Sequence, residues 1–176
     1  IIRYYLFSFK FTGNQGLITD IYYFYKMNIC IASLVVGQQY GQAVSLATQS
    51  KQDYCAVHGH GLVIGGDYDP SRPIPWSKIP LLQKTLPQHD YVFWSDADAT
   101  VVNYDRRLED FFGDFLDSDR HLVITRDAAG NVNTGNFLIR NTPWSFQLLQ
   151  RMWEQTQFID HIWWDNMAFI HLLGTA

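Results

Sequence analysis

The sequence has few charged residues and no run of basic ones. Charged side chains make up 17% of its 176 residues, and the formal net charge is -4 at pH 7. A surface that binds nucleic acid usually concentrates positive charge, so the composition argues against a DNA or RNA partner. Hydrophobic residues reach 47% and aromatic residues 16%, which excludes a disordered chain. The length suffices for one domain with its own core.

Long apolar stretches and a cysteine framework are also missing. A membrane-spanning helix needs ~18 or more apolar residues in sequence, and the best candidate, 27–36, is interrupted by Asn28 and Ser33. The two cysteines, Cys30 and Cys55, stand in apolar or helix-like surroundings without metal-ligand spacing. We therefore expect buried free thiols rather than a disulfide.

The first 26 residues show no clear period, although they are rich in Tyr and Phe. Gly13, Asn14 and Gly16 stand in their middle, and Met27 directly precedes the first convincing strand. We hypothesise that residues 27–176 form the domain. Residues 1–26 are then an N-terminal appendage. We hypothesise that this appendage is not part of the native coding sequence.

Apolar periodicity predicts alternating strands and helices over the rest of the chain. Strands are expected at 29–36, 62–64, 91–95, 121–125 and 134–140, and helices at 42–58, 76–86, 106–112, 143–156 and 164–173. This order predicts an α/β fold with a mostly parallel central sheet flanked by helices. Such sheets bind ligands beyond the C-terminal ends of their strands, and both 38–40 and 96–98 are expected there.

Local patterns define the helix at 42–58 further. Ala43, Leu46, Ala47, Tyr54 and Val57 recur at three-to-four spacing, which predicts its buried face. Gly59 is expected to end it as a C-terminal cap.

Two acidic residues, Asp96 and Asp98, follow the apolar run Tyr91–Trp94. Burying an unpaired carboxylate is costly, and a hard divalent cation such as Mg²⁺ or Mn²⁺ removes that cost by accepting oxygen ligands. The pair therefore suggests a metal site that holds phosphate groups. A solvated turn with two acidic residues is the simpler interpretation, since Asp-x-Asp alone is common.

Several blocks together resemble one family. They are Lys51–His60, Trp76–Leu82, Trp94–Ala99, Asn133–Ser145 and Trp164–Ala168. In order and spacing they are similar to the galactosyl/mannosyl/xylosyl transferases of glycosyltransferase family 34, over roughly residues 29–173. The resemblance implies a GT-A fold, a Mn²⁺ or Mg²⁺ ion and a UDP- or GDP-sugar donor. It also implies transfer of a hexose or pentose to a glycan acceptor with retention of configuration.

The resemblance assigns roles to individual residues. Asp96 and Asp98 would ligate the metal, and Asp165 and Asn166 would act at the anomeric carbon. Asn133, Thr134 and Gly135 would line the donor sugar. The remaining candidates for binding the nucleotide-sugar are Gln38, Tyr40, Lys51, Asp53, Tyr54 and Trp94. Simpler interpretations stay open: an ordinary turn for 133–135, helix capping by Asp165, and a solvated helix face for 51–54.

The tryptophans Trp144, Trp153, Trp163 and Trp164 are expected mainly in the core. Carbohydrate sites also use aromatic faces, so Trp163 or Trp164 is a candidate for stacking on an acceptor sugar.

One departure from the family shapes the alternatives. Members usually carry a His that completes the metal site beyond the last block, whereas this sequence ends at Ala176, so we expect truncation at the C-terminus. The alternative function is a non-catalytic remnant that binds nucleotide-sugars or glycans. A phosphohydrolase is disfavoured because Gly37-Gln38-Gln39, without a carboxylate, follows the first strand. The family resemblance suggests a Golgi or secretory membrane, reached only through a segment absent from this sequence.

Overall fold

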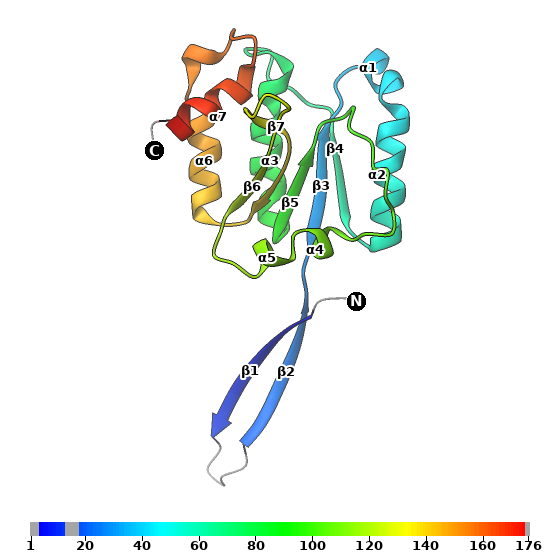
Figure 1. Ribbon diagram of the computed structural model, residues 1–176, viewed down its shortest axis with the longest axis vertical. Helices are drawn as coiled ribbons and strands as arrows, with labels where there is room; N and C mark the ends of the chain where they lie inside the picture. Colours follow the sequence, from blue (N-terminus) through cyan, green and yellow to red (C-terminus); the bar gives the residue numbers. More distant parts are fainter. Residues whose placement is uncertain (1–3, 13–17, 175–176) are drawn as a thin grey trace.

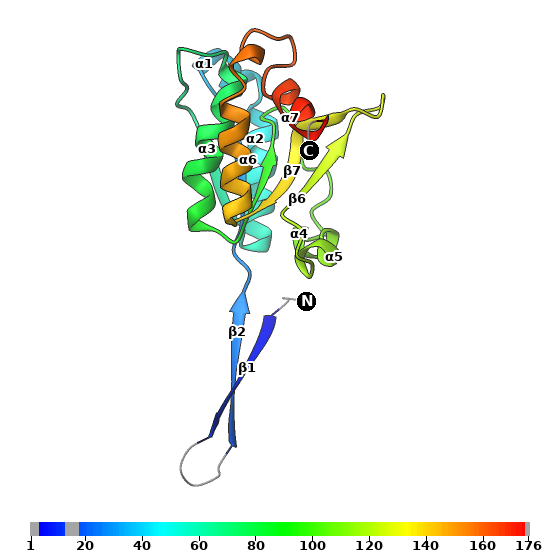
Figure 2. The same cartoon turned by 90° about the vertical axis from the view of Figure 1, so that its left-hand side faces the viewer.

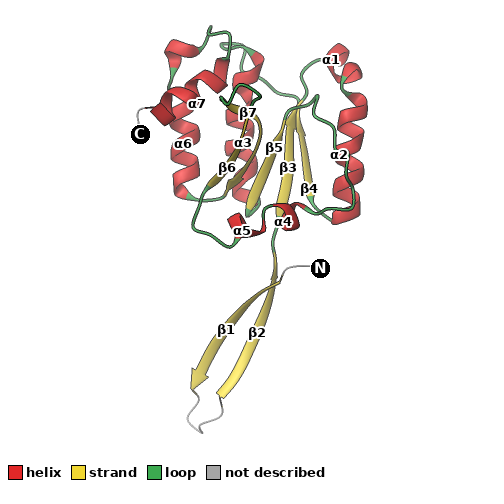
Figure 3. Cartoon of the chain, in the orientation of Figure 1, coloured by secondary structure: helices red, strands yellow, loops and turns green. Residues whose placement is uncertain are grey.

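The computed structural model describes residues 4–12 and 18–174 and contains two separate sheets (Figure 1). The smaller one pairs β1 (Tyr4–Thr12) with β2 (Ile18–Lys26) in antiparallel register, from Tyr4 opposite Lys26 to Thr12 opposite Ile18. Figure 3 shows this pair lying beyond one end of the α/β body. The predicted appendage covers these strands, and the hypothesis that it is not natively coded stays a prediction. Part of the appendage and the expected truncation point at Ala176 lie outside the described residues.

The larger sheet has five strands in the order β4-β3-β5-β7-β6. Their bounds are β3 (Ile29–Leu34), β4 (Gly61–Gly65), β5 (Tyr91–Ser95), β6 (Leu122–Arg126) and β7 (Val132–Arg140). β3 pairs in parallel with β4 and β5, whereas β7 runs antiparallel to both β5 and β6. The expectation of a mostly parallel sheet therefore holds for only half of the pairings. The turn between β6 and β7, residues 127–131, is too short for a parallel crossover.

Helices cover both faces of this sheet (Figure 2). They are α1 (Gln38–Ala43), α2 (Ser45–His58), α3 (Lys78–Thr85), α4 (Leu108–Phe111), α5 (Gly113–Leu116), α6 (Pro143–Trp153) and α7 (Trp164–Gly174), with 3-10 turns at Ile74–Ser77, Leu86–Gln88 and Thr156–Phe158. The predicted helix at 42–58 is thus two helices that meet at Val44. Across the described part of the chain, no helix combines the length and apolarity that a membrane crossing requires.

Local signals explain where these helices start and stop. Gly59 ends α2 in the left-handed region at φ 70°, as expected for a C-terminal cap. Thr142 caps α6, where its hydroxyl accepts a bond from the Ser145 N–H, and Pro143 occupies the first turn.

The core follows the alternation of β3. Cys30, Ala32 and Leu34 pack in a cluster with apolar side chains of α3, α6 and α7, and Ile29 and Ile31 join clusters on the opposite face. Both cysteines are buried and free, as predicted. Burial raises the pKa of Cys30 to about 12 and that of Cys55 to about 11, so both thiols stay protonated at neutral pH.

The buried face of α2 differs from the predicted one. Leu46 is 83% exposed and Val57 is 65% exposed. The residues that α2 buries are Ala47, Ser50, Lys51, Tyr54 and Cys55. This spacing still has the helical period, but polar side chains occupy two of its five positions because they bond to loops beside the sheet. The prediction is therefore confirmed for Ala47 and Tyr54 and wrong for Ala43, Leu46 and Val57, which are exposed.

Candidate active site

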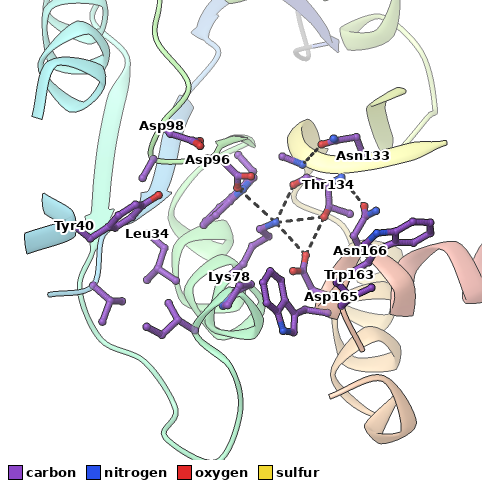
Figure 4. A pocket seen from close by; sticks show the side chains of 18 of the residues that line it. Leu34, Tyr40, Lys78, Asp96, Asp98, Asn133, Thr134, Trp163, Asp165 and Asn166 are labelled. Carbon is purple, nitrogen blue, oxygen red and sulfur yellow. Dashed lines mark hydrogen bonds and ion pairs between the residues drawn. The ribbon is translucent and has the colours of Figure 1, made fainter. Parts of the chain in front are cut away.

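A cavity of about 640 Å³ opens where β3 and β5 end, and the start of α7 forms its far wall (Figure 4). The structure brings many of the predicted site residues to it: Tyr40, Trp94, Asp96, Asp98, Asn133, Thr134, Gly135, Asp165 and Asn166 all line the cavity. Gln38, Lys51, Asp53 and Tyr54 do not. This volume lies in the range of typical small-molecule sites, ~300–1,000 Å³.

Asp96 is held in a fixed orientation at the end of β5. Its Oδ1 accepts a bond from the indole Nε1 of the buried Trp94 at 2.8 Å, and its backbone N–H donates to the Gly135 carbonyl. A Cβ added at Gly135 would lie 2.7 Å from Asn133 Oδ1 and 2.9 Å from Asp96 Oδ2, so a side chain there would displace both polar groups. Burial is the main reason that the pKa of Asp96 is raised, and Lys78 partly opposes the shift.

Asp98 faces solvent at the mouth of the cavity, opposite the α7 wall. Tyr40, which also lines the cavity, is 44% exposed. Burial of its ring, followed by the charges of Asp98 and Asp96, raises the pKa of the Tyr40 hydroxyl. Tyr40 and the acidic pair therefore lie in one electrostatic environment, with Tyr40 in its neutral form.

Lys51 lies behind this site rather than in it. It is only 1% exposed, and its Nζ donates to the carbonyl oxygens of Asp96, Ala97 and Ala99. Burial lowers the pKa of Lys51, an effect that the charges of Asp98 and Asp96 oppose. Lys51 thus shapes the loop that carries the acidic pair.

The other predicted nucleotide contacts lie elsewhere. Asp53 is exposed on α2 and accepts a bond from Gln49 at 2.8 Å. Tyr54 is buried in the core, and its hydroxyl donates to the Arg106 carbonyl. Gln38 is exposed outside the cavity lining. The buried Tyr54 and exposed Asp53 match the simpler interpretation of 51–54, whereas the buried Lys51 does not belong to a solvated helix face.

A buried ion pair forms the floor of the cavity, between α3 and α7. Lys78 Nζ lies 3.0 Å from Asp165 Oδ2 and 3.6 Å from Asp96 Oδ1, and it also donates to the Thr134 carbonyl. The Thr134 hydroxyl donates to the same Asp165 oxygen at 3.0 Å. The sequence pattern did not indicate a role for Lys78. Its place in the apolar segment 74–82 was the available signal, because a buried lysine nearly always has an ionic partner.

Both ends of the Asn166 side-chain amide are hydrogen-bonded to β7. Its Oδ1 accepts from the Thr134 N–H at 2.8 Å, and its Nδ2 donates to the Val132 carbonyl at 3.2 Å. These bonds anchor the first turn of α7 to β7. Asn166 therefore positions Asp165 and Thr134, and the role at the anomeric carbon that the resemblance implies for it stays a prediction.

Comparison with known proteins places the chain in a family. The family described as "Protein of unknown function, DUF273" matches residues 54–173, which is more than half of the chain. The chain belongs to the DUF273 family.

Relatives of this DUF273 chain carry glycosyltransferase names. It is 27% identical to an uncharacterized alpha-1,2-galactosyltransferase of Schizosaccharomyces pombe, an alignment that covers 71% of this chain and 44% of that protein. It is 25% identical to the probable alpha-1,6-mannosyltransferase MNN10 of Saccharomyces cerevisiae, covering 69% and 39%. Probable glycosyltransferase 3 of Oryza sativa subsp. indica is 32% identical, covering 58% and 24%. The chain thus spans less than half the length of these relatives, whose names confirm the family resemblance.

Solved structures support the fold. A glycosyltransferase involved in glycosylation of the major capsid of PBCV-1 matches with a TM-score of 0.69 at 14% identity, covering 83% of this chain and 75% of that one. The glycosyltransferase GlyE of Streptococcus pneumoniae TIGR4 matches with a TM-score of 0.51 at 13% identity, covering 84% and 43%. The expected GT-A-like α/β fold is confirmed.

The tryptophans of the DUF273 chain separate into two groups. Trp76 and Trp94 are in the core, at 0% and 2% exposure, whereas Trp163 and Trp164 are 49% and 40% exposed in the cavity wall. The expectation of a core position is therefore wrong for Trp163 and Trp164, and also for Trp144, which is 42% exposed, whereas Trp153 packs against the core. Trp164 also has a φ of 40°, a left-handed conformation that is rare for an aromatic residue.

Proposed function

We propose that this DUF273 chain is the catalytic domain of a metal-dependent, retaining glycosyltransferase. Its donor is a UDP- or GDP-sugar, from which a hexose or pentose passes to a glycan acceptor. The placement of Asp96 and Asp98 at the mouth of a cavity of about 640 Å³ carries this proposal. The glycosyltransferase names of its relatives support it.

The donor atoms at the end of β5 fit a hard divalent cation. Asp96 and Asp98 would supply carboxylate oxygens to Mn²⁺ or Mg²⁺, and water or phosphate oxygens suit the remaining positions. Within residues 4–12 and 18–174, no three His, Cys, Asp or Glu side chains are grouped to hold a metal. When bound, the cation would neutralise charge that develops on the departing nucleoside diphosphate.

The chain's own residues prepare the site before the donor arrives. Trp94 fixes one oxygen of Asp96, and Lys51 holds the backbone of the loop that carries Asp98. Asp165 is held by Lys78 and Thr134 at the floor. A fixed carboxylate there would stabilise positive charge at the anomeric carbon, because preorganised charges need no reorientation during the reaction.

Titration calorimetry with UDP in the presence and absence of Mn²⁺ tests the donor side. We expect Mn²⁺-dependent UDP binding, weakened at least roughly tenfold in Asp98→Asn, which corresponds to about 1.4 kcal/mol. Asp53→Asn is the matched control, since Asp53 is an exposed carboxylate outside the cavity. UDP binding without Mn²⁺ dependence, or equal loss in both variants, would contradict the proposal.

Turnover separates the enzyme from the alternative, a non-catalytic domain. A panel of UDP- and GDP-sugars with Mn²⁺ should yield free UDP or GDP, and NMR of the released or transferred sugar should show a retained anomeric configuration. Binding of the donor without any turnover would support the non-catalytic alternative. An inverted product would overturn the assignment of a retaining reaction.

A further inference from the structure

The α7 wall of the cavity carries a cluster of exposed apolar side chains. Ile162, Trp163 and Trp164 are consecutive and are 76%, 49% and 40% exposed. Ile74, at 43% exposure, lines the same cavity. Soluble proteins rarely leave such a cluster uncovered without a binding role. We name Ile162, Trp163 and Trp164 the α7 platform.

The platform is built by a defined backbone rather than by a loose loop. The Trp164 N–H donates to the His161 carbonyl at 2.9 Å, and the Trp163 N–H donates to His161 Nδ1 at 3.1 Å. The carbonyl of Trp163 accepts from the Asn166 N–H at 2.9 Å. Together with the positive φ of Trp164, these bonds fix the platform directly before the anchored first turn of α7.

The position of the platform points to an acceptor rather than to a nucleotide. Asp98 and Tyr40 lie on the opposite wall, and Asp165 and Lys78 lie between the two walls (Figure 4). If the donor's diphosphate binds at the acidic pair, the α7 wall stays free. The acceptor can then bind there and approach the donor sugar from the opposite side. This step depends on the proposed function.

The chemistry of the platform fits a sugar ring. A pyranose presents C–H groups on one face and hydroxyls around its edge. The indole faces offer a large apolar surface to the C–H face, and exposed Asn133 and Asp127 in the same cavity offer hydrogen-bond partners to hydroxyls. An apolar platform with polar groups nearby matches that division.

We infer that the α7 platform is the acceptor subsite, where Trp163 stacks on a pyranose ring of a glycan. The neighbouring Trp164 and Ile162 extend the apolar surface along the chain of the acceptor. The subsite therefore selects for a saccharide ring rather than for a free polyol of similar hydroxyl content.

Saturation-transfer NMR on the full 176-residue chain tests this inference with three probes: α-mannotriose, xylotriose and α-galactobiose. At least one should receive saturation at its ring C–H protons, with sorbitol as the polyol control. Trp163→Ala should weaken that binding about tenfold, and Trp163→Phe should retain part of it. Trp144→Ala is the matched control, because Trp144 is 42% exposed outside the cavity lining, and a melting curve checks that each variant is folded.

Each result decides the inference. Loss in Trp163→Ala with binding kept in Trp144→Ala supports it. Equal affinity in Trp163→Ala and the unmutated chain, equal loss in both tryptophan variants, or no binding of any of the three probes overturns it. Titration of the unmutated chain with UDP and with GDP, each with Mn²⁺, reports separately on the proposed function. Saccharide binding through Trp163 without binding of either nucleotide would leave the subsite standing and refute the donor assignment.

Discussion

Two acidic corners of the cavity differ in how much of their charge the protein itself neutralises. At the end of β5, Asp98 is exposed, and Asp96 accepts a bond from the Trp94 indole and lies 3.6 Å from Lys78 Nζ. At the start of α7, Asp165 is 3% exposed and paired with Lys78 at 3.0 Å. Lys78 therefore neutralises the second corner at closer range than the first, which also presents the exposed Asp98 to solvent. Under the proposed function, similar residue types would serve cation binding at one corner and preorganisation at the other.

The largest expected effect comes from breaking the neutralised corner. Lys78→Met would leave the buried Asp165 carboxylate without its cation, which should lower the free energy of unfolding by about 3–5 kcal/mol. Urea denaturation measures this directly. Lys84→Met, an exposed lysine on the same helix, should change it by less than ~0.5 kcal/mol. Equal effects of the two variants would show that the ion pair has no special weight.

Lys51 offers a second test, at the acidic corner itself. Lys51→Met would remove the donor for the three loop carbonyls, and we expect a loss of about 1.5–3 kcal/mol in unfolding free energy. Mn²⁺-dependent UDP binding should weaken as well, because the loop carrying Asp98 loses its support. Gln52→Met, on the exposed side of α2, is the control. Unchanged UDP binding in a destabilised Lys51→Met would limit Lys51 to a role in stability.

Asn166 sharpens the distinction between a positioning role and a donor contact. Asn166→Ala would leave the Thr134 N–H without its side-chain acceptor, at a cost of about 1–3 kcal/mol in unfolding free energy. Asn166→Gln should not restore stability, since the longer side chain displaces both bonds to β7. Urea denaturation together with turnover checks this. If Asn166→Gln is as stable as the native chain and more active, the donor contact is the better description.

Local signals in the sequence predicted the elements of the fold well. The apolar run of β3, the cap at Gly59 and the Thr142-Pro143 start of α6 each depend on neighbouring residues only. The direction of β7 did not emerge, because it depends on a short turn and on pairing with β5, whose residues are distant in the chain. The sequence pattern alone indicates the period and the boundaries of helices and strands. It does not indicate which strands pair with one another.

The same limit explains the site. The sequence motifs identified Asp96, Asp98 and Asp165, but the partner of Asp165 is Lys78, 87 residues earlier. On α2, Lys51 is buried and Asp53 is exposed. Residues two positions apart on a helix point in directions roughly 200° apart. A block of motif residues therefore mixed a structural lysine with a solvated aspartate, and only the packing of α2 separates them.

The smallest expected effect on stability belongs to Asp98, and it completes the comparison. Because Asp98 is exposed, Asp98→Asn should change the free energy of unfolding by less than ~0.5 kcal/mol. Asp165→Asn, at the neutralised corner, would leave Lys78 buried opposite a neutral amide and should cost several times more. Urea denaturation of both variants at pH 7 measures the difference. If Asp98 contributes little to stability but controls Mn²⁺-dependent UDP binding, its role is to bind the ligand. A large loss of stability in Asp98→Asn would instead give Asp98 a structural role.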